Sequence, residues 1–190
     1  MIIDWQQIDT VLLDMDGTLL DLHYDNCYWV EHLPKLYAEK QNMSVTSAKQ
    51  LLEKQLASKF GQIEWYCTDY WSQELDINIA KTKAEDEVAK KIAFRPHAEQ
   101  FLQNLRKMDK DIWMLTNAHR DVLDIKCQRL NLEVHFDRLI SSHDFGFSKE
   151  HPNFWQELQN NFPIDLERSL FVDDSLPILR MAQQLSLIHI

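Results

Sequence analysis

Cysteine is scarce in this chain and is not arranged in pairs. The three cysteines, Cys27, Cys67 and Cys127, are widely spaced along 190 residues and form no CxxC motif. This number and spacing argue against a disulfide framework and indicate reduced, buried thiols of a cytoplasmic protein. The histidines likewise lack the HxH and HExxH spacings of zinc enzymes. The sequence therefore gives no reason to expect a zinc site.

Positive charge is also in short supply. The chain has 20 Lys and Arg against 30 Asp and Glu, a formal net charge of −10. Nucleic-acid polymers are bound by clustered cations, so we expect no such partner. A small phosphate ester remains possible as a ligand if a metal and a few local cations offset the repulsion. No apolar run reaches membrane-spanning length, and no basic region followed by an apolar stretch marks a signal peptide.

Short apolar runs alternate with helical patterns over much of the chain, and 45% of its residues are hydrophobic. Each run ends in polar residues. This alternation predicts an α/β fold whose parallel sheet is covered on both faces, with ligands bound at the carboxyl ends of the strands. The predicted strands are 11–13, 111–117, 137–142 and 169–174, and the predicted helices are 97–108, 120–132, 151–162 and 175–185.

Residues 21–94 interrupt the alternation, because they contain no convincing strand and only one glycine and one proline. The pattern predicts a helical cap over the site, inserted after the first strand. The expected helices are roughly 24–42, 44–60, 62–76 and 79–93.

Aromatic residues concentrate in the third of these helices, which carries Trp65, Tyr66, Tyr70 and Trp71. Aromatics at this spacing form a packing stripe in the core of a cap. The alternative is that one or two of them, Trp65 and Trp71 being the candidates, line a substrate pocket.

Two carboxylates follow the first strand in the segment TVLLDMDGTLL. Asp14 and Asp16 would face opposite sides of an ideal strand, but Gly17 allows the strand to break so that both approach one site. Asp14 is then suited to attack phosphorus and form an aspartyl-phosphate. Asp16 is suited to protonate the leaving oxygen and later to deprotonate water. Such hard oxygen ligands favour Mg²⁺.

The other strand ends supply what phosphoryl transfer further requires. Thr116 and Asn117 offer a hydroxyl and backbone N–H groups to a phosphate, and Lys149 offers a cation. Asp173 and Asp174 are adjacent acids that repel each other unless a cation lies between them, so a metal site explains them better than a helix N-cap does.

The ordered motifs DMDGT, LTN, a lysine in FGFSKEHPNF and FVDDS resemble the haloacid dehalogenase-like hydrolase superfamily over nearly the whole chain. The resemblance implies a Rossmann-like core, residues 1–20 and 95–190, with an all-helical cap at 21–94, and Mg²⁺ as cofactor. It also implies that Asp14 is the nucleophile and Asp16 the acid/base. Thr116 and Lys149 would hold the phosphoryl group. The metal residues would be Asp14, Asp16 through its backbone carbonyl, Asp174 and Asp173.

Within the superfamily, the bacterial GMP/IMP nucleotidase group is the group that four segments resemble: TVLLDMDGTLLDLHYDN, WYCTDYWSQEL, LTNAH and FGFSKE. This resemblance implies hydrolysis of purine 5′-mononucleotides to nucleoside and phosphate, with an aromatic cap residue stacking on the base. The superfamily core normally continues with another strand after the last helix. Leu187 to Ile190 are the residues expected to begin it, without the usual glycine.

Other functions of the same fold remain open. A sugar-phosphate phosphatase or a phosphosugar mutase would share the first-strand motif. A haloacid dehalogenase would not need Asp16, and a non-catalytic phosphate-binding module would be expected to lose one of the four charged motif residues. A phosphonatase would need a desolvated cap lysine, which nothing marks among Lys35, Lys40, Lys49 and Lys54. Two histidines that follow predicted strands, His119 and His143, are candidates for the rim of the site, and His23 for the mouth of the cap.

Overall fold

A parallel β-sheet forms the centre of the protein. The computed structural model describes residues 3–185 and 187–189. The strands are ordered β3-β2-β1-β4-β5, and every pairing is parallel. This confirms the predicted α/β, Rossmann-like fold. The strands are β1 (Thr10–Leu13), β2 (Asp111–Thr116), β3 (Arg138–Ser141), β4 (Ser169–Val172) and β5 (Ile188–His189).

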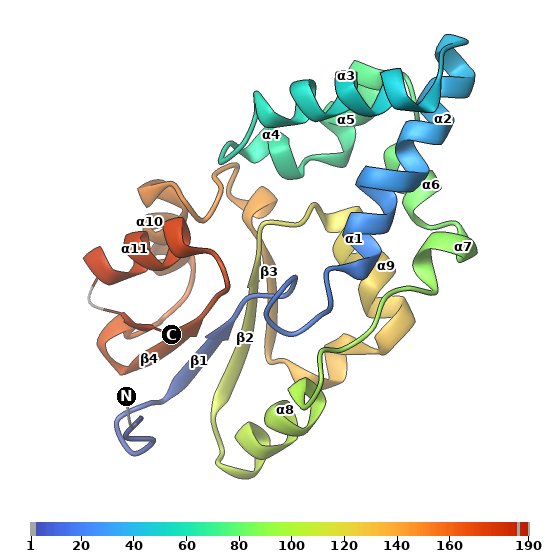
Figure 1. Cartoon of the computed structure of the whole chain (residues 1–190). Coiled ribbons are helices and arrows are strands. Elements are labelled where there is room, and N and C mark those ends of the chain that lie inside the picture. The colour runs from blue at the N-terminus through green and yellow to red at the C-terminus, as the bar shows by residue number, and fades with distance from the viewer. Residues whose placement is uncertain (1–2, 186, 190) are drawn as a thin grey trace.

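Successive residues of β1, β2, β3 and β4 contribute to two different hydrophobic clusters, as expected for a sheet covered on both faces. Val11 and Leu13 of β1 belong to the cluster that includes α8 and α9, whereas Leu12 belongs to the cluster of α10 and α11. Figure 1 shows these two helix pairs on opposite sides of the strands. They are α8 (Ala98–Lys107), α9 (Arg120–Leu130), α10 (Pro152–Asn161) and α11 (Leu176–Gln184).

The end of the chain adds an edge strand. β5 pairs with β4 through Leu170 opposite Ile188 and Phe171 opposite His189. The strand expected over Leu187 to Ile190 is therefore present at these two residues, while Ile190 lies outside the described residues.

The segment between β1 and β2 is helical. Its third predicted helix is divided at Cys67, whose backbone is extended (φ −86°, ψ 112°), and its fourth is divided at Glu85 (ψ 134°). A π-helical stretch, Cys27–His32, joins α1 to α2. The α-helices are α1 (His23–Asn26), α2 (Leu33–Gln41), α3 (Val45–Ala57), α4 (Ile63–Tyr66), α5 (Thr68–Leu75), α6 (Ile79–Lys83) and α7 (Asp86–Ala89). Short 3₁₀ turns elsewhere are Leu132–His135, Ser142–Asp144 and Leu166–Arg168.

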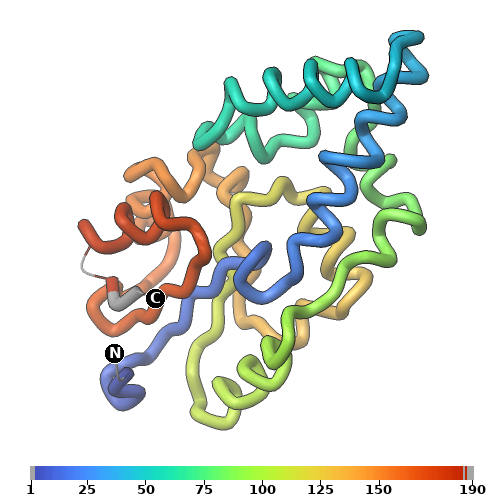
Figure 2. The backbone as a smooth tube through the Cα atoms, in the orientation of Figure 1, coloured from blue at the N-terminus to red at the C-terminus, as the bar shows by residue number. Residues whose placement is uncertain are grey.

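The chain leaves the sheet and returns to it through two hydrogen-bonded linkers. The N–H of Asp21 donates to the Ala93 carbonyl (2.9 Å), and the N–H of Arg95 donates to the Leu19 carbonyl (2.8 Å). Figure 2 follows this path from the blue segment after β1 to the green segment before α8. We propose this junction as the boundary between a core of residues 1–20 and 95–190 and a cap of residues 21–94.

The helices α3, α4 and α5 lie beyond the carboxyl ends of the strands (Figure 1). They therefore lie over the edge of the sheet where parallel α/β folds bind their ligands. No helix in residues 3–185 or 187–189 is long and apolar enough to cross a membrane.

Replacement of a buried leucine of α8 tests the packing of this helix on the sheet. Leu102 is 0% exposed, so Leu102→Ala is expected to lower the free energy of unfolding by about 2–5 kcal/mol, measured by urea denaturation. Leu51→Ala is the control, because Leu51 is 44% exposed and its loss is expected to cost about 0.5 kcal/mol or less. Equal losses in the two variants would contradict the assigned packing.

Candidate active site

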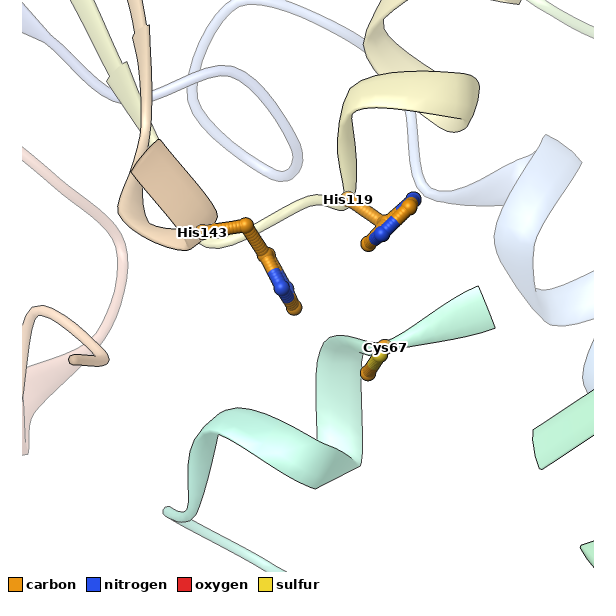
Figure 3. A group of neighbouring side chains, drawn as sticks. All are labelled: Cys67, His119 and His143. Carbon is orange, nitrogen blue, oxygen red and sulfur yellow. The ribbon is translucent and has the colours of Figure 1, made fainter. Parts of the chain in front are cut away.

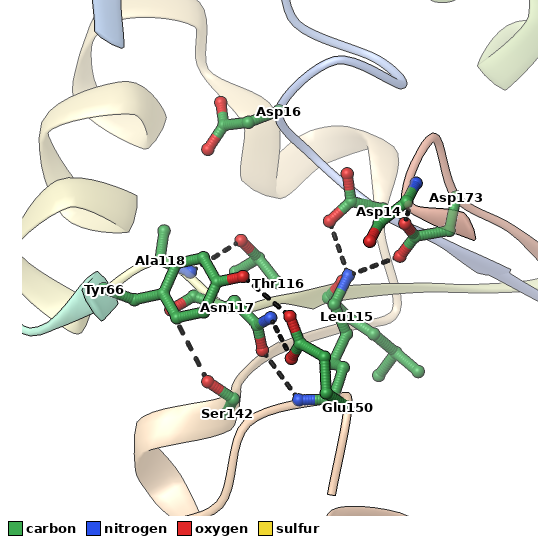
Figure 4. A network of polar contacts seen from close by, with 12 residues as sticks. Asp14, Asp16, Tyr66, Leu115, Thr116, Asn117, Ala118, Ser142, Glu150 and Asp173 are labelled. Carbon is green, nitrogen blue, oxygen red and sulfur yellow. Dashed lines mark hydrogen bonds and ion pairs between the residues drawn. The ribbon is translucent and has the colours of Figure 1, made fainter. Parts of the chain in front are cut away.

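A buried lysine lies between two carboxylates at the carboxyl ends of β1 and β4. The Lys149 ammonium donates to Asp14 Oδ1 (2.6 Å), to Asp173 Oδ2 (2.7 Å) and to the Leu115 carbonyl (2.9 Å). Dashed lines in Figure 4 mark the contacts at Asp14 and Asp173. Lys149 is only 1% exposed, so both ion pairs are shielded from water. The arrangement joins three strands through one side chain.

Burial and the neighbouring charges shift the pKa values of Asp14 and Lys149. Burial raises the pKa of Asp14 to about 7, although the Lys149 charge acts in the opposite direction. Burial lowers the pKa of Lys149, but the neighbouring carboxylates outweigh it and raise that pKa above its usual value. Lys149 is therefore a permanent cation beside Asp14.

A third carboxylate, Asp174, completes the acidic cluster. Oxygen atoms of Asp14, Asp173 and Asp174 lie within 4.8 Å of one another. Burial, and then the charge of Asp173, raises the pKa of Asp174. Three carboxylates against one ammonium leave excess negative charge, and their oxygens are the ligands that Mg²⁺ prefers. The donor set therefore fits a hard divalent cation.

Gly17 allows the loop after β1 to reach Asp174. Its φ of +87° is unfavourable for other residues, and a Cβ atom built there would lie 2.1 Å from Asp174 Oδ2. The backbone of this loop can thus lie directly against the acidic cluster. Asp14 itself is fixed by its N–H, which donates to the Val172 carbonyl of β4 (2.9 Å).

Asp16 does not join this cluster through its side chain. Its carboxylate points away from Asp14 in Figure 4 and accepts from Lys126 of α9 (2.5 Å). Lys126 also donates to Asp25 of α1 (2.7 Å), which accepts in turn from Lys83 of α6 (2.7 Å). Burial raises the pKa of Asp16, against the opposing effect of Lys126.

None of Asp25, Lys83 and Lys126 was predicted as a site residue. A signal was present for Lys126, because it lies four residues after buried Val122 and so on the inward face of α9. No sequence signal distinguishes Lys83, and only the fold shows its environment. Its ammonium lies near the ring centres of Tyr24 (4.8 Å), Tyr28 (4.6 Å) and Trp29 (5.0 Å).

Thr116 and Asn117 lie at the end of β2, beside Lys149. The Thr116 hydroxyl accepts from the Ala118 N–H (3.0 Å), and Asn117 Oδ1 accepts from the Lys149 N–H (2.8 Å). The Asn117 amide also donates to Glu150 (2.9 Å), which accepts from the Tyr66 hydroxyl of α4 (2.8 Å), as Figure 4 shows. Glu150 was not predicted as a site residue, and it connects α4 to the sheet.

A cavity of about 810 Å³ opens between the carboxyl ends of the strands and the inserted helices. Its floor includes Asp14, Asp16, Thr116, Asn117, Lys149, Asp173 and Asp174. The side formed by the inserted helices is largely apolar and includes Trp29, Val30, Pro34, Leu52, Leu56, Phe60 and Trp65, with Lys49 and Glu53 beside them. This volume is typical of sites for small organic ligands.

The two tryptophans proposed for the pocket are placed differently. Trp65 lines the cavity, whereas Trp71 is 2% exposed and donates from its indole to the Trp65 carbonyl (3.2 Å). Trp71 thus packs behind Trp65. His119 and His143 stand against each other, with ring centres 4.7 Å apart, and His23 lies near Lys91 (3.3 Å).

Comparisons with known proteins agree with this geometry. A family model described as haloacid dehalogenase-like hydrolase matches residues 8–185. The chain belongs to this family. It is a hydrolase, and the resemblance found from the motifs is confirmed. It is similar to GMP/IMP nucleotidase YrfG of Escherichia coli (strain K12), with 37% identity over 182 residues that cover 96% of this chain and 81% of that protein.

Solved structures share the fold. The HAD phosphatase from Thermococcus onnurineus superimposes with a TM-score of 0.83 at 17% identity, covering 96% of this chain and 85% of the other. YfnB of Bacillus subtilis, bound to magnesium, gives 0.70 at 19% identity, covering 96% and 87%. L-2-haloacid dehalogenase of Xanthobacter autotrophicus gives 0.66 at 17% identity, covering 96% and 76%. At these identities the likeness is one of fold.

Removal of the Lys126 cation tests the ion network around Asp16. Lys126→Met leaves the partly buried Asp16 and Asp25 carboxylates near each other with one fewer cation, so we expect a loss of up to about 3–5 kcal/mol in the free energy of unfolding. Lys107→Met, at the exposed end of α8, is the control and is expected to change it by about 0.5 kcal/mol or less. If chemical denaturation gives the same stability for both variants, the network has no structural role.

Proposed function

We propose that this enzyme is a magnesium-dependent phosphomonoester hydrolase that acts through an aspartyl-phosphate on Asp14 and prefers the purine 5′-mononucleotides GMP and IMP. The observation that carries the proposal is the Asp14–Lys149–Asp173 cluster beside Asp174, at the floor of a cavity large enough for a nucleotide. The 37% identity to a GMP/IMP nucleotidase supports the choice of substrate.

The first step of the proposed reaction is attack by Asp14 on the phosphorus. A carboxylate oxygen of Asp14 forms the new O–P bond while the bond from phosphorus to the ester oxygen breaks. Lys149 and Thr116 hold the phosphoryl oxygens. The Lys149 ammonium, whose nitrogen lies 2.6 Å from Asp14 Oδ1, offsets the negative charge of these oxygens. Asp14, Asp174 and the backbone carbonyl of Asp16 would hold a magnesium ion, and Asp173 would support Asp174. Such an ion would neutralise further charge on the phosphoryl group.

Asp16 acts as the general acid and then as the general base in the proposed reaction. Its carboxyl group protonates the departing ribose oxygen, and its carboxylate then removes a proton from the water that attacks the aspartyl-phosphate. The O–P bond to Asp14 breaks and phosphate leaves. The raised pKa of Asp16 favours the protonated form needed first. To reach the ester oxygen, the side chain has to turn away from Lys126, with which it pairs in this structure.

The apolar wall of the cavity is the proposed site for the base. Trp65 lines it and contacts Phe60 edge-on, with ring centres 5.4 Å apart. A flat purine can stack on an indole held in this way. The phosphate would then lie at the carboxylates and the base at the inserted helices, which makes the cap the source of selectivity.

A substrate panel tests the proposed function. Phosphate release is measured with Mg²⁺ and with EDTA on GMP, IMP, AMP, UMP, sugar phosphates and p-nitrophenyl phosphate. We expect Mg²⁺-dependent release that is fastest on GMP and IMP, and a fall in kcat of at least about a thousandfold in Asp14→Asn. Asp4→Asn, at an exposed acid remote from the cavity, is the control. Faster release from sugar phosphates would refute the nucleotide assignment, and full activity of Asp14→Asn would refute the nucleophile.

The role of Trp65 is tested separately. Trp65→Ala is expected to raise KM for GMP about tenfold or more, because base stacking contributes about 1–3 kcal/mol, and to leave KM for p-nitrophenyl phosphate nearly unchanged. Trp5→Ala removes an indole that does not line the cavity and should alter neither value. Equal increases for both substrates in Trp65→Ala would indicate that Trp65 only supports the cap.

A further inference from the structure

Three metal-ligating side chains converge beside the cavity, none of them used by the proposed reaction. A sulfur or ring-nitrogen atom of each of Cys67, His119 and His143 lies within 4.8 Å of the corresponding atoms of the other two. Figure 3 shows Cys67 approaching from the segment between α4 and α5, and the two histidines from the segments that follow β2 and β3. All three residues are partly buried.

Each histidine has one ring nitrogen engaged by the protein. The His143 ring donates a hydrogen bond to the backbone carbonyl of Asn117. Nδ1 of His119 lies 2.8 Å from the Thr68 hydroxyl and 3.3 Å from Asp121 Oδ2. Such partners fix the ring orientation of histidines that bind metals.

The other nitrogen of each ring is available to a ligand. Nε2 of His143 is buried and has no hydrogen-bond partner among residues 3–185 and 187–189, a costly state for a polar atom. Nε2 of His119 lies 3.7 Å from Asp69 Oδ2, which is beyond hydrogen-bond length. A metal ion would satisfy both nitrogen atoms.

We propose that Cys67, His119 and His143 form a binding site for a divalent cation of the zinc class, which ties the segment between α4 and α5 to the loops after β2 and β3. One thiolate and two imidazoles are ligands for zinc and cobalt rather than for magnesium. The fourth position is open to water or to Asp69. The site shares no residue with the carboxylate cluster, so the protein would hold two cations of different chemistry.

The three ligand atoms lie within 4.8 Å of one another, which is somewhat farther apart than a bound metal ion would hold them. Tetrahedral zinc holds its ligand atoms about 3.3–3.8 Å apart, given bonds of about 2.0–2.3 Å. Binding therefore draws the three side chains closer together than they stand here.

The position of the site gives it a consequence for the cavity. Cys67 directly follows Tyr66, and His119 directly follows Ala118, and both of these neighbours line the cavity. A cation bound at the three side chains fixes two parts of the cavity wall relative to each other. Its occupancy is therefore expected to stabilise the observed arrangement of α4 and α5 over the strands.

Cobalt titration of the full chain tests the proposal, with excess Mg²⁺ present to occupy the carboxylate cluster. We expect one equivalent of Co²⁺ to bind with a near-ultraviolet thiolate-to-cobalt absorption band that Zn²⁺ abolishes by displacement. Cys67→Ser should remove the band, and His143→Ala should weaken binding at least about tenfold. Zn²⁺ should raise the Tm of the unaltered protein but not that of Cys67→Ser.

Cys27→Ser is the matched control, because Cys27 is also a partly buried free thiol but lies outside the three-residue group. It should keep the band and the affinity. Circular dichroism verifies that each variant folds, and His143→Gln replaces His143→Ala if the latter does not. The proposal is overturned if no thiolate band forms, or if Cys67→Ser and Cys27→Ser bind cobalt with equal affinity. Neither result bears on the proposed hydrolysis at Asp14.

Discussion

The ion pairs of Lys149 hold the centre of this structure together. Two carboxylates, Asp14 and Asp173, lie side by side because β1 pairs with β4, and their buried negative charges repel each other. The ammonium of Lys149 lies between them and also binds a carbonyl of β2. Breaking a buried pair leaves an uncompensated charge, so the three side chains form a single unit. Two carboxylates paired with one ammonium leave a net negative charge in this unit, and that charge favours the binding of a divalent cation beside it.

The inserted helices contact the sheet through polar links as well as through apolar packing. Lys126 of α9 bridges Asp16 and Asp25, and the Tyr66 hydroxyl reaches Glu150. The Thr68 hydroxyl contacts His119. Each of these links ends next to a residue that lines the cavity. The position of the helices is thus coupled to the geometry of the residues that would act on a substrate.

Much of the fold could be predicted from local patterns. The four strands and the helices α8 to α11 were predicted close to their observed bounds, because the burial of a residue in a regular element depends on neighbours two to four positions away. The breaks in the inserted segment were missed. Cys67 adopts an extended backbone between two aromatic helical turns, and nothing in the local spacing of IEWYCTDYW marks that change.

The sequence motifs predicted the residues that line the floor of the cavity, but they did not predict which of these residues form ion pairs. The partners Asp14 and Lys149 are 135 positions apart, and Asp16 and Lys126 are 110 apart. The side chain of Asp16 was expected to share the site of Asp14, whereas it pairs with Lys126 in this structure. Lys126 was not predicted as a site residue, since its helical position says only that it faces inward.

The sequence by itself determined the α/β class, the order of strands and helices, and the acids that follow β1 and β4, because these depend on residues close together in the chain. Only the tertiary structure decided which charges meet, that Trp65 rather than Trp71 lines the cavity, and that Cys67, His119 and His143 come together. The spacing of cysteine and histidine along the chain gave no sign of this group. Its members come from three separate segments, and contacts of that kind are fixed by the packing of the inserted helices on the sheet.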